Sequence, residues 1–340
     1  MRNDKVCKEL FFSKTLDYLG RYLPNQALKS IHTIETYRDA LTIFRRYVTN
    51  EKQMSLKKFR FEDCTHEFLL DYIAYLNESG CAPRTCNNRL AAVRSYLWYV
   101  ADGDVSLQSI ALTASKVPFL RVPKSIRATI EENDLKALLA APPNTKIGLR
   151  DRVIMILLYD SAIRVSELLE LKVLSLNTTA SVPYIRVHGK GDKDRIVAIT
   201  DKTVAHLNVY MDKYHPNRDR EQPLFYTVIK GQMGTMSSGN VERILRKYAD
   251  QIRPEHSDLP ERVYPHMVRR TRATNLYQNG VELELVSRIL GHSSTETTRI
   301  YAVPSIEMMR EAMEKGNLST PEEAMWPDDE DEMARLCGLR

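Results

Sequence analysis

Residues 157–173 read LLYDSAIRVSELLELKV, and this stretch sets an arginine between two helical patterns. Apolar residues recur at helical spacing through Asp151–Tyr159, and a second helical run begins at Ser166 after Arg164. An arginine at this point aims its forked guanidinium at an anion, and the helix N-terminus adds its partial positive charge. An ion pair with Glu167 explains the same arginine equally well, so this stretch alone leaves both interpretations open.

Three further segments hold unusual polar residues beside strong apolar patterning. The stretch SVPYIRVHGKGDKDRIVAIT, residues 181–200, has two β-rich runs around a turn at 189–192, which predicts a hairpin with Lys190 projecting from its tip. It is not a phosphate-binding P-loop, because the GxxxxGK[ST] spacing is missing. The stretch YPHMVRRTRATNLY, residues 264–277, sets His266 and Arg269 on one expected helix face. In LGHSSTETTRIYA, residues 290–302, His292 precedes Tyr301.

Each of these residues taken alone also has a structural explanation. His266 suits a helix start, His292 suits the position after a helix cap at Gly291, and Tyr301 suits a core. Together and in this order, the segments resemble the tyrosine recombinase (phage integrase) family, which includes the bacterial Xer recombinases. The resemblance covers roughly residues 128–312 and rests on the stretches A-I-R-V-S-E-L-L-E-L, V-H-G-K-G-D-K-D-R, H-M-V-R-R-T-R-A-T and L-G-H-S-S-T-E-T-T-R-I-Y.

The resemblance implies a site-specific recombinase that cleaves and rejoins DNA through a covalent 3′-phosphotyrosine intermediate. Carried over position by position, it marks this catalytic set: Arg164, Lys190, His266, Arg269, His292 and Tyr301. The chain departs from the family pattern in small ways. Ala162 stands where a glycine is common, Val197-Ala198 replaces Val-Pro, and Arg270 replaces a frequent histidine. None of these departures removes a group that the chemistry needs.

The basic residues of the set also suit phosphodiester chemistry without the family name. Arg164 and Arg269 can each donate paired hydrogen bonds to the non-bridging oxygens of a phosphate as charge develops there. Lys190 is expected to protonate the departing 5′ oxygen from the tip of the hairpin.

The nucleophile needs help of a different kind. A tyrosine has an ordinary pKa of about 10, so Tyr301 requires a proton acceptor or a strongly cationic site. His266 is the expected acceptor, and His292 is expected to donate to the phosphate. None of these steps calls for a metal, ATP or another cofactor.

The patterning divides the chain into four parts. We expect a mainly α-helical protein with a small β-hairpin or sheet. Residues 1–102 are predicted to form a helical core-binding domain, 103–127 a basic linker that opens at Asp102-Gly103-Asp104, 128–315 a mixed α+β catalytic domain, and 316–340 an acidic tail. Helical patterning begins almost at once, which favours a simple Xer-like or transposon-type recombinase over the larger phage integrases.

In the first domain, one helix is predicted to begin at Thr65 as N-cap and to stop at Gly80. Another follows Pro83. It places a set of apolar residues inward, namely Leu90, Val93, Leu97 and Val100. Its polar positions are rich in Arg and Asn, which reach phosphates and base edges, and the candidate DNA contacts are Arg84, Asn87, Asn88, Arg89 and Arg94. An ordinary solvated helix face fits the same pattern.

The charge distribution suits a polyanionic partner. The net charge is +5, but residues 321–340, PEEAMWPDDEDEMARLCGLR, hold 7 acidic and 2 basic residues. Without them the chain has 47 basic and 37 acidic residues (49 − 2 and 44 − 7), a net charge of +10. The acidic end can be a solvated tail or a docking segment.

Composition also bears on compartment and metal content. Hydrophobic residues make up 43% and charged residues 27%, which fits a globular protein. No apolar run approaches the ~20 residues of a membrane span, and residues 1–12 lack a secretory core. We therefore expect a cytoplasmic, nucleoid-associated bacterial protein. The cysteines (Cys7, Cys64, Cys81, Cys86 and Cys337) are scattered and predict reduced thiols rather than a zinc site.

The resemblance further implies a tetramer on two DNA duplexes that carry inverted-repeat core sites. The amphipathic stretch VPSIEMMREAMEK, residues 303–315, can dock on a neighbouring subunit or pack on its own domain. Two other functions compete: a DNA-binding protein of the same fold without strand transfer, and a type IB topoisomerase. Dimer resolution, transposition, integration and inversion all stay open as biological roles.

Overall fold

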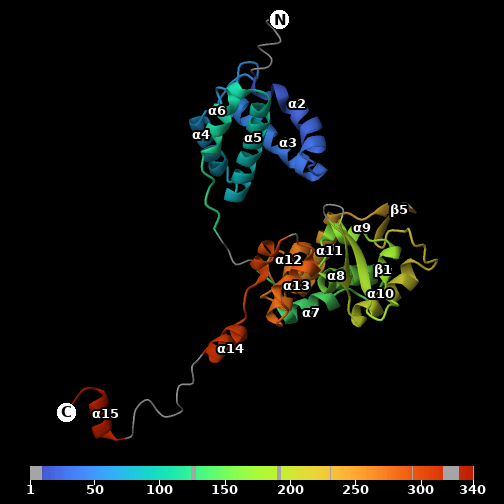
Figure 1. The fold of residues 1–340 in the computed structure, drawn as a ribbon. Helices are drawn as coiled ribbons and strands as arrows, with labels where there is room; N and C mark the ends of the chain where they lie inside the picture. The colour runs from blue at the N-terminus through green and yellow to red at the C-terminus, as the bar shows by residue number, and fades with distance from the viewer. Residues whose placement is uncertain are drawn as a thin grey trace. The chain divides into compact units, whose positions relative to one another are not determined.

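The structure is a computed structural model of the 340-residue chain, and it describes residues 10–123, 128–189, 193–229, 231–292, 294–316 and 329–339. The chain divides into two compact units, Met1–Ile126 and Arg127–Arg340. Helices dominate both units, and the strands of the described residues all lie in the second unit (Figure 1). The predicted fold class, a helical domain followed by a mixed α and β domain, is confirmed.

The first unit packs its helices around an aromatic core. Thr65 caps α4 by accepting a hydrogen bond from the Phe68 N–H at 3.2 Å, as its position predicts, and Gly80 follows the helix with φ +79°. The positions of α5 that were expected to point inward are all buried: Leu90, Val93, Leu97 and Val100. The main helices of the unit are η2 (Tyr18–Gln26), α3 (Ile31–Arg46), α4 (His66–Glu78), α5 (Pro83–Gly103) and α6 (Gln108–Ser115), preceded by η1 (Phe11–Lys14) and α2 (Thr15–Asp17).

The predicted linker over residues 103–127 is wrong for most of its length. The chain turns after α5 through η4 (Val105–Leu107), and α6 then packs back on α5 and α4. Ala111, Ala114 and Val117 are buried in the core of the first unit. The turn at Asp102-Gly103-Asp104 therefore joins two helices of one domain, because the small apolar side chains beyond it gain by leaving water.

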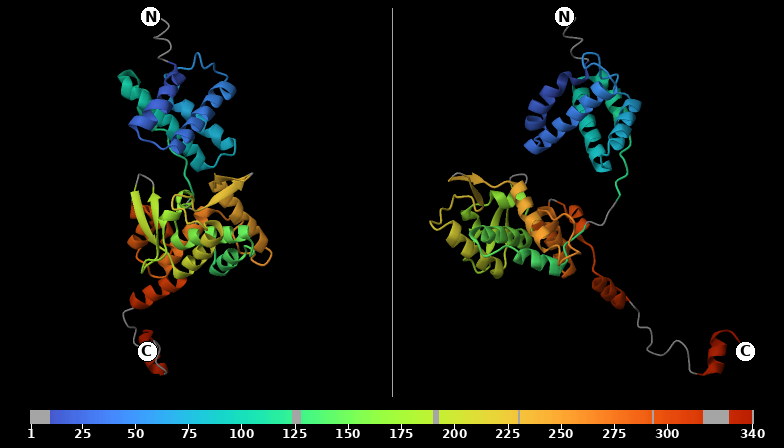
Figure 2. Two further views of the ribbon diagram at one scale, coloured as in Figure 1. Left: turned by 90° about the vertical axis from the view of Figure 1, so that its right-hand side faces the viewer. Right: turned by 180° about the vertical axis from the view of Figure 1, so that it is seen from behind.

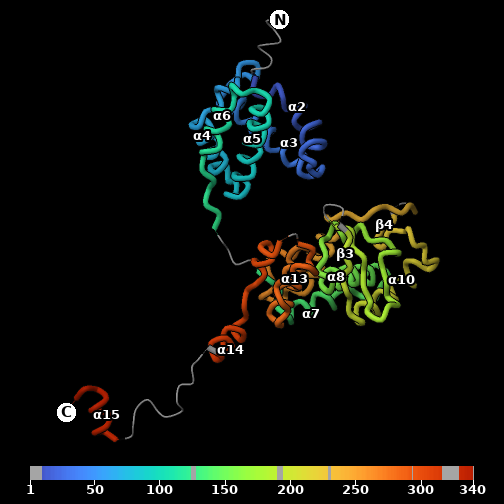
Figure 3. The backbone as a smooth tube through the Cα atoms, in the orientation of Figure 1, coloured from blue at the N-terminus to red at the C-terminus, as the bar shows by residue number. Residues whose placement is uncertain are grey.

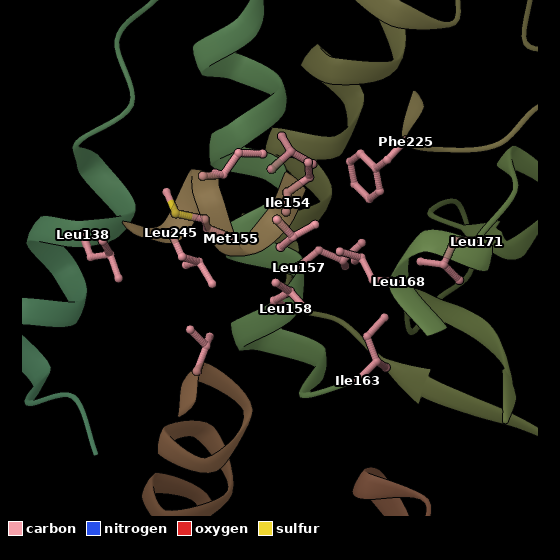
Figure 4. Close-up of a cluster of buried hydrophobic side chains, with 14 of the residues drawn as sticks. Leu138, Ile154, Met155, Leu157, Leu158, Ile163, Leu168, Leu171, Phe225 and Leu245 are labelled. Carbon is pink, nitrogen blue, oxygen red and sulfur yellow. The ribbon is translucent and has the colours of Figure 1, made fainter. Parts of the chain in front are cut away.

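The second unit has one large apolar core around the helix α8 (Lys146–Ser161). Figure 4 shows side chains from other elements converging on this helix, among them Leu138, Leu168, Phe225 and Leu245. The other helices of this unit are α7 (Glu132–Ala140), α9 (Val165–Glu170), α10 (Asp201–Tyr214), α11 (Ser238–Ile252), α12 (Pro265–Gln278), α13 (Leu283–Leu290), α14 (Ile306–Gly316) and α15 (Glu330–Leu336), with short turns η5 (Val173–Ser175), η6 (Thr295–Thr297) and η7 (Arg299–Tyr301).

The predicted hairpin at residues 181–200 is confirmed. β2 (Tyr184–Gly189) pairs antiparallel with β3 (Lys193–Ala198), and β1 (Leu176–Asn177) adds a third strand on the other side of β2. Arg195 and Val197 share one face of β3, because side chains alternate along a strand. A second hairpin, β4 (Tyr226–Ile229) with β5 (Gln232–Thr235), was not predicted.

Helices from distant parts of the sequence pack together in the second unit. α12 packs against α8, and α13 packs against α12, which Figures 2 and 3 show as orange helices beside green ones. A small separate cluster joins these helices to the end of α8 and to η7: Ala162, Ala273, Val286, Leu290 and Tyr301. Within the described ranges, no helix has the length and apolar character that a membrane crossing requires.

Candidate active site

A left-handed turn at Ala162 sets Arg164 at the start of a new helix. α8 ends at Ala162 with φ +50° and ψ +25°. This conformation costs a residue with a Cβ about 1–2 kcal/mol, whereas glycine adopts it readily. The need for this turn explains why glycine is common at the position in the family that the sequence resembles. Arg164 is then the N-cap of α9.

Glu167 binds Arg164 through both backbone and side chain. Its Oε2 accepts the Arg164 N–H at 2.8 Å, and its Oε1 accepts from Arg164 Nη1 at 2.8 Å. Arg195 of β3 donates to the same two oxygens at 3.0 and 2.8 Å. The ion pair that the sequence left open is therefore present, and it belongs to a larger cluster of charge-assisted hydrogen bonds.

The Glu167 carboxylate is the centre of this cluster, and only 4% of the residue is exposed. Burial by itself raises the pKa of this carboxyl, but the hydrogen bonds from Arg195 and from the Arg164 N–H outweigh burial and lower the pKa to about 2. Glu167 is thus ionised at neutral pH, and it fixes the directions of two guanidinium groups.

Gly291 makes room for Arg195. A Cβ at this glycine would lie 2.8 Å from the Arg195 guanidinium carbon, and the φ of +62° also favours glycine. Arg195 Nε donates to the Ile289 carbonyl at 3.4 Å beside it. Gly291 therefore ends α13 and also leaves room for the Arg195 guanidinium to approach the backbone.

Arg269 lies deepest in the site, with 1% of the residue exposed. Its Nη1 donates to the Ala162 carbonyl at 2.7 Å, its Nη2 donates to the Leu290 carbonyl at 2.7 Å, and its Nη1 lies 3.9 Å from Glu167 Oε2. Burial, followed by the neighbouring Arg164, lowers the pKa of Arg269 to about 10, although Glu167 and Tyr301 act in the opposite direction. The guanidinium is still charged at neutral pH and is held in one orientation.

His292 is neutral and has a defined tautomer. Its Nε2 lies 3.2 Å from Arg269 Nη2, and its Nδ1 lies 2.8 Å from Thr298 Oγ1. Because arginine can only donate, Nε2 is the acceptor, and Nδ1 carries the proton that it gives to Thr298. Burial and then the charges of Arg269, Arg164, Arg195 and His266 lower the pKa of His292 to about 4. In this arrangement His292 accepts from Arg269 and donates to Thr298. The predicted donation from His292 to a phosphate would require a different set of hydrogen bonds.

Tyr301 closes the site from the η7 side. Only 2% of the residue is exposed, and its ring stacks beside the His292 ring with centroids 6.0 Å apart and planes 25° apart. Ala162 and Leu290, whose carbonyl groups accept hydrogen bonds from Arg269, also pack in its cluster. The Tyr301 side chain therefore packs against residues that hold Arg269.

Arg164, Arg269, His292 and Tyr301 of the predicted catalytic set meet in one cluster. His266 lies exposed at the start of α12, and its charge is the smallest of the causes that lower the pKa of His292. Arg164 and Arg269 both contribute to that same pKa. Lys190 lies outside the described residues.

The predicted DNA contacts on α5 divide into two groups. Asn87 exchanges hydrogen bonds with the Leu120 backbone at 2.9 and 2.8 Å, and Arg94 donates to the carbonyls of Ala114 (2.8 Å) and Val117. These polar groups of Asn87 and Arg94 tie the chain after α5 to the helix, and their assignment as DNA contacts stays a prediction.

The other candidates on this helix have different surroundings. Arg89 donates to Cys81 Sγ at 3.0 Å and is half-buried. Arg84 and Asn88 are exposed. The exposed DNA-binding candidates therefore lie on the first turns of α5.

The sequence offered Glu167 only as an ion-pair partner of Arg164 and indicated no role for Arg195 or Thr298. Glu167 had a signal, because a Glu three residues after a helix start is a capping residue. Arg195 ends the V-H-G-K-G-D-K-D-R stretch. It stands two residues before Val197 on β3, so both lie on the inner face of the strand. Thr298 had no signal in the sequence. Among the described residues, no three His, Cys, Asp or Glu side chains gather as a metal site would need.

Profiles of two known domains match most of the chain. The phage integrase family profile matches residues 128–307, and the phage integrase SAM-like domain profile matches residues 14–101. The tyrosine recombinase XerA of Thermococcus onnurineus is 31% identical over 249 residues, 73% of this chain and 81% of that protein. The tyrosine recombinase XerC of Chlamydia caviae is 28% identical over 313 residues, 87% of this chain and 96% of that protein.

Solved structures share the fold. The Tn1549 transposon integrase in complex with a circular intermediate DNA has a TM-score of 0.67 at 16% identity, over 91% of this chain and 99% of that one. The XerH site-specific recombinase bound to its difH substrate has a TM-score of 0.63 at 21% identity, over 85% of this chain and 81% of that one.

The two matching family profiles and the 31% identical XerA define a tyrosine recombinase, an enzyme that breaks and rejoins DNA strands at specific sites. With both of its domains matched, the chain belongs to the phage integrase family.

Proposed function

We propose that Tyr301 is the nucleophile and that Arg164, Lys190, His266, Arg269 and His292 assist it. The observation that carries this proposal is the stacking of Tyr301 beside His292, which itself contacts Arg269. Tyr301 attacks the scissile phosphate, a bond forms between the phenol oxygen and phosphorus, and the bond from phosphorus to the 5′ oxygen breaks. The 3′-phosphotyrosine conserves the energy of the bond, so a 5′ hydroxyl of another strand can reverse the step.

The charged groups divide the work. Arg164 and Arg269 stabilise the non-bridging oxygens, and their fixed orientation means that little reorganisation is needed as charge develops. His266 takes the phenol proton, and Lys190 protonates the 5′ oxygen. His292 and Glu167 act as positioning residues for the two arginines, as their present hydrogen bonds support. Because Tyr301 is buried without DNA, we propose that η7 shifts when the phosphate enters.

We further propose that the enzyme works as a tetramer on two duplexes with inverted-repeat core sites. α14 supports this assembly, because Ile306, Met309 and Met313 recur along one side of the helix and all are exposed. Such a stripe gains stability by burial against another surface, and a neighbouring subunit provides one. The proposed role is the mobility or the resolution of a genetic element in the bacterial cytoplasm, at the nucleoid.

Tyr301→Phe tests the nucleophile. On a nicked suicide substrate, whose released fragment cannot rejoin, the parent chain should accumulate a covalent adduct that survives denaturing electrophoresis. The variant should form none and should bind the same DNA nearly as well, because only the phenol oxygen is lost. Tyr277→Phe, on α12, is the matched control and should form the adduct normally. An adduct with Tyr301→Phe would refute the assignment.

A modified substrate tests Lys190. A 5′-bridging phosphorothiolate releases a thiol of low pKa that needs no protonation. Lys190→Ala should therefore be slow on ordinary DNA and recover most of the parent rate on the phosphorothiolate. Arg164→Ala should recover on neither, because its role concerns the non-bridging oxygens. Equal defects of Lys190→Ala on both substrates would exclude the general acid, and rescue of Lys193→Ala would move that role along the hairpin.

A further inference from the structure

A basic groove lies on the second unit among residues that the active site does not use. A cavity of about 620 Å³ between α7, α8 and α10 adjoins another of about 470 Å³, and Asn144, Arg152 and His206 line both. We call the combined feature the basic groove. Its floor is apolar, since Leu139, Leu149, Ile156 and Val209 line it.

One wall of the basic groove is tightly held. The Pro143 carbonyl oxygen lies 2.1 Å from the place of a Cβ on Gly148, so the loop approaches α8 as closely as a glycine permits. Arg152 of α8 donates to Asn144 Oδ1 at 3.2 Å and to the Pro142 carbonyl. The groove therefore has a built shape that does not depend on mobile side chains alone.

The rim of the groove is cationic. α10 carries Lys202, His206, Val209 and Lys213 at helical spacing along one stripe, and all of them line the groove. Lys136 and Lys146 add to the rim, although Lys136 shares its charge with Glu132 at 2.6 Å. This arrangement favours an anionic partner with apolar side chains for the floor.

The acid among the described lining residues does not weaken that rim. Asp160 accepts hydrogen bonds from Thr203 at 2.7 Å and from the Thr200 N–H at 2.8 Å, and it pairs with Arg272 at 3.3 Å. Its charge is thus directed to α10 and α12 and is balanced there.

The acidic tail has the matching character. α15 carries Glu330, Asp331 and Glu332 in its first turn, while Met333 and Leu336 are exposed, as is Leu339 beyond it. No residue of α15 is buried. A helix this short is marginal in water, because isolated helices below about 12–15 residues lack the stability to persist. An acidic helix whose residues are all at least partly exposed and a basic groove with an apolar floor therefore occur in the same unit.

We propose that the tail segment 329–339 docks in the basic groove of its own chain. The acidic first turn faces the lysines of the rim, and Met333 and Leu336 cover the apolar floor. Twelve residues, 317–328, connect α14 to this segment, and a chain of that length spans up to about 40 Å. Attachment to the same chain gives the tail a high effective concentration at the groove, which favours its own groove over that of a second copy in dilute protein.

Disulfide trapping tests the docking on the full chain. Cys337 is an exposed native thiol at the end of α15. Val209→Cys introduces a thiol in the groove at a position that is 52% exposed, and Val228→Cys introduces one on β4 at 64% exposure as the matched control. Under mild oxidation the Val209→Cys chain should form an intramolecular disulfide with Cys337 about tenfold faster or more, as peptide mapping would show. Equal rates for the two chains, or a disulfide that joins two chains, would overturn the proposal.

Charge reversal tests the chemistry of the contact. Replacing Glu330, Asp331 and Glu332 with Lys in the Val209→Cys chain should slow trapping about tenfold, and adding Lys202→Glu with Lys213→Glu should restore it. The control pair is Arg243→Glu with Lys247→Glu on α11. Added to the same chain with the substituted tail, it should leave the slow trapping rate unchanged. Lys202→Glu with Lys213→Glu should also slow trapping in the Val209→Cys chain with its native acidic tail. If these two substitutions weaken DNA binding and do not slow that trapping, the groove serves DNA and the proposal fails.

Discussion

Arg94 in the first unit is half-buried and Arg269 in the second unit is buried, yet both make the same kind of hydrogen bond. Each donates to two backbone carbonyls, Arg94 to Ala114 and Val117 and Arg269 to Ala162 and Leu290. Burial lowers the pKa of both side chains. The sequence assigned both to DNA, one as a contact and the other as a catalytic residue.

Their neighbours separate the two roles. Arg94 stacks on Phe119 with its guanidinium 4.6 Å from the ring centroid, and burial is the cause of its pKa shift. Arg269 lies among Arg164, Glu167, His292 and Tyr301, so its charge is coupled to groups that can bind or attack a phosphate. Hydrogen bonds to carbonyls therefore do not identify a functional arginine, whereas the charged and nucleophilic groups around it do.

The largest expected effect follows from removing Arg269. Arg269→Ala should reduce the rate of covalent adduct formation by about 10²–10³-fold, since an oriented donor to developing charge is lost. Single-turnover cleavage at saturating protein measures this rate. Arg272→Ala, on the same helix and paired with Asp160 at 3.3 Å, is the matched control and should cleave nearly normally. A smaller loss for Arg269→Ala than for Arg272→Ala would mean that Arg269, like Arg94, serves the fold rather than cleavage.

Arg195 extends the comparison to a positioning residue. Arg195→Ala should slow cleavage by up to about 100-fold, because Glu167 loses one of its two hydrogen-bonding arginines and orients Arg164 less firmly. DNA affinity should change little, and Arg195→Lys should restore part of the rate. Arg186→Ala, an exposed arginine on β2, is the strand control. A defect confined to DNA affinity would make Arg195 a DNA contact instead.

Arg94 should give the opposite result. Arg94→Ala should lower the free energy of unfolding of the first unit by about 1–3 kcal/mol, because buried carbonyls of the α6 end lose their donor. Adduct formation by the folded protein should be unchanged. The chain has 2 tryptophans, so denaturant unfolding of a Trp326→Phe background reports the surroundings of Trp98. An unchanged unfolding curve together with weaker DNA binding would restore Arg94 as a DNA contact.

The pH dependence of stability tests the neutral state of His292. Its pKa in the folded protein is about 4, below the ordinary 6.5, so the unfolded chain takes up a proton in that range and the folded chain does not. The free energy of unfolding should therefore decrease as pH falls from about 6.5 towards about 4. Glu167, whose pKa is lowered from 4.5 to about 2, adds its own loss below about pH 4.5.

The difference between the parent and His292→Asn isolates the histidine in that measurement. Between pH 4.5 and 6.5 the parent should lose stability more steeply than the variant, as denaturant titrations at each pH would show. Parallel curves would mean that the pKa of His292 is the same in the folded and the unfolded chain.

The smallest effect concerns the exposed start of α5. Arg84→Ala should weaken DNA binding and reduce the slope of log affinity against log salt by about one unit, the loss of one phosphate contact. Arg94→Ala should leave that slope unchanged. An identical slope for Arg84→Ala and the parent would show that this face of α5 does not touch phosphates.

The amino-acid sequence was enough to predict the main helices, the hairpin and the candidate catalytic set. Helical periodicity located α4, α5, α8 and α12, and alternation located the β2–β3 hairpin, because both patterns arise from local geometry that burial then reinforces. Arg164, His266, Arg269, His292 and Tyr301 stood out because their spacing within short segments is unusual and resembles a known family.

Which polar side chains hold the fold, and which meet at the site, became clear from the packing of the folded chain. Asn87 and Arg94 look like a solvated DNA face in the sequence, but α6 and the chain to Leu120 fold back and use their hydrogen bonds. Arg195 and Glu167 are far apart in the chain, and no local pattern shows that they meet. The reason is physical: periodicity records which side of an element is apolar, whereas the partner of a buried polar group is set by long-range packing that local spacing does not record.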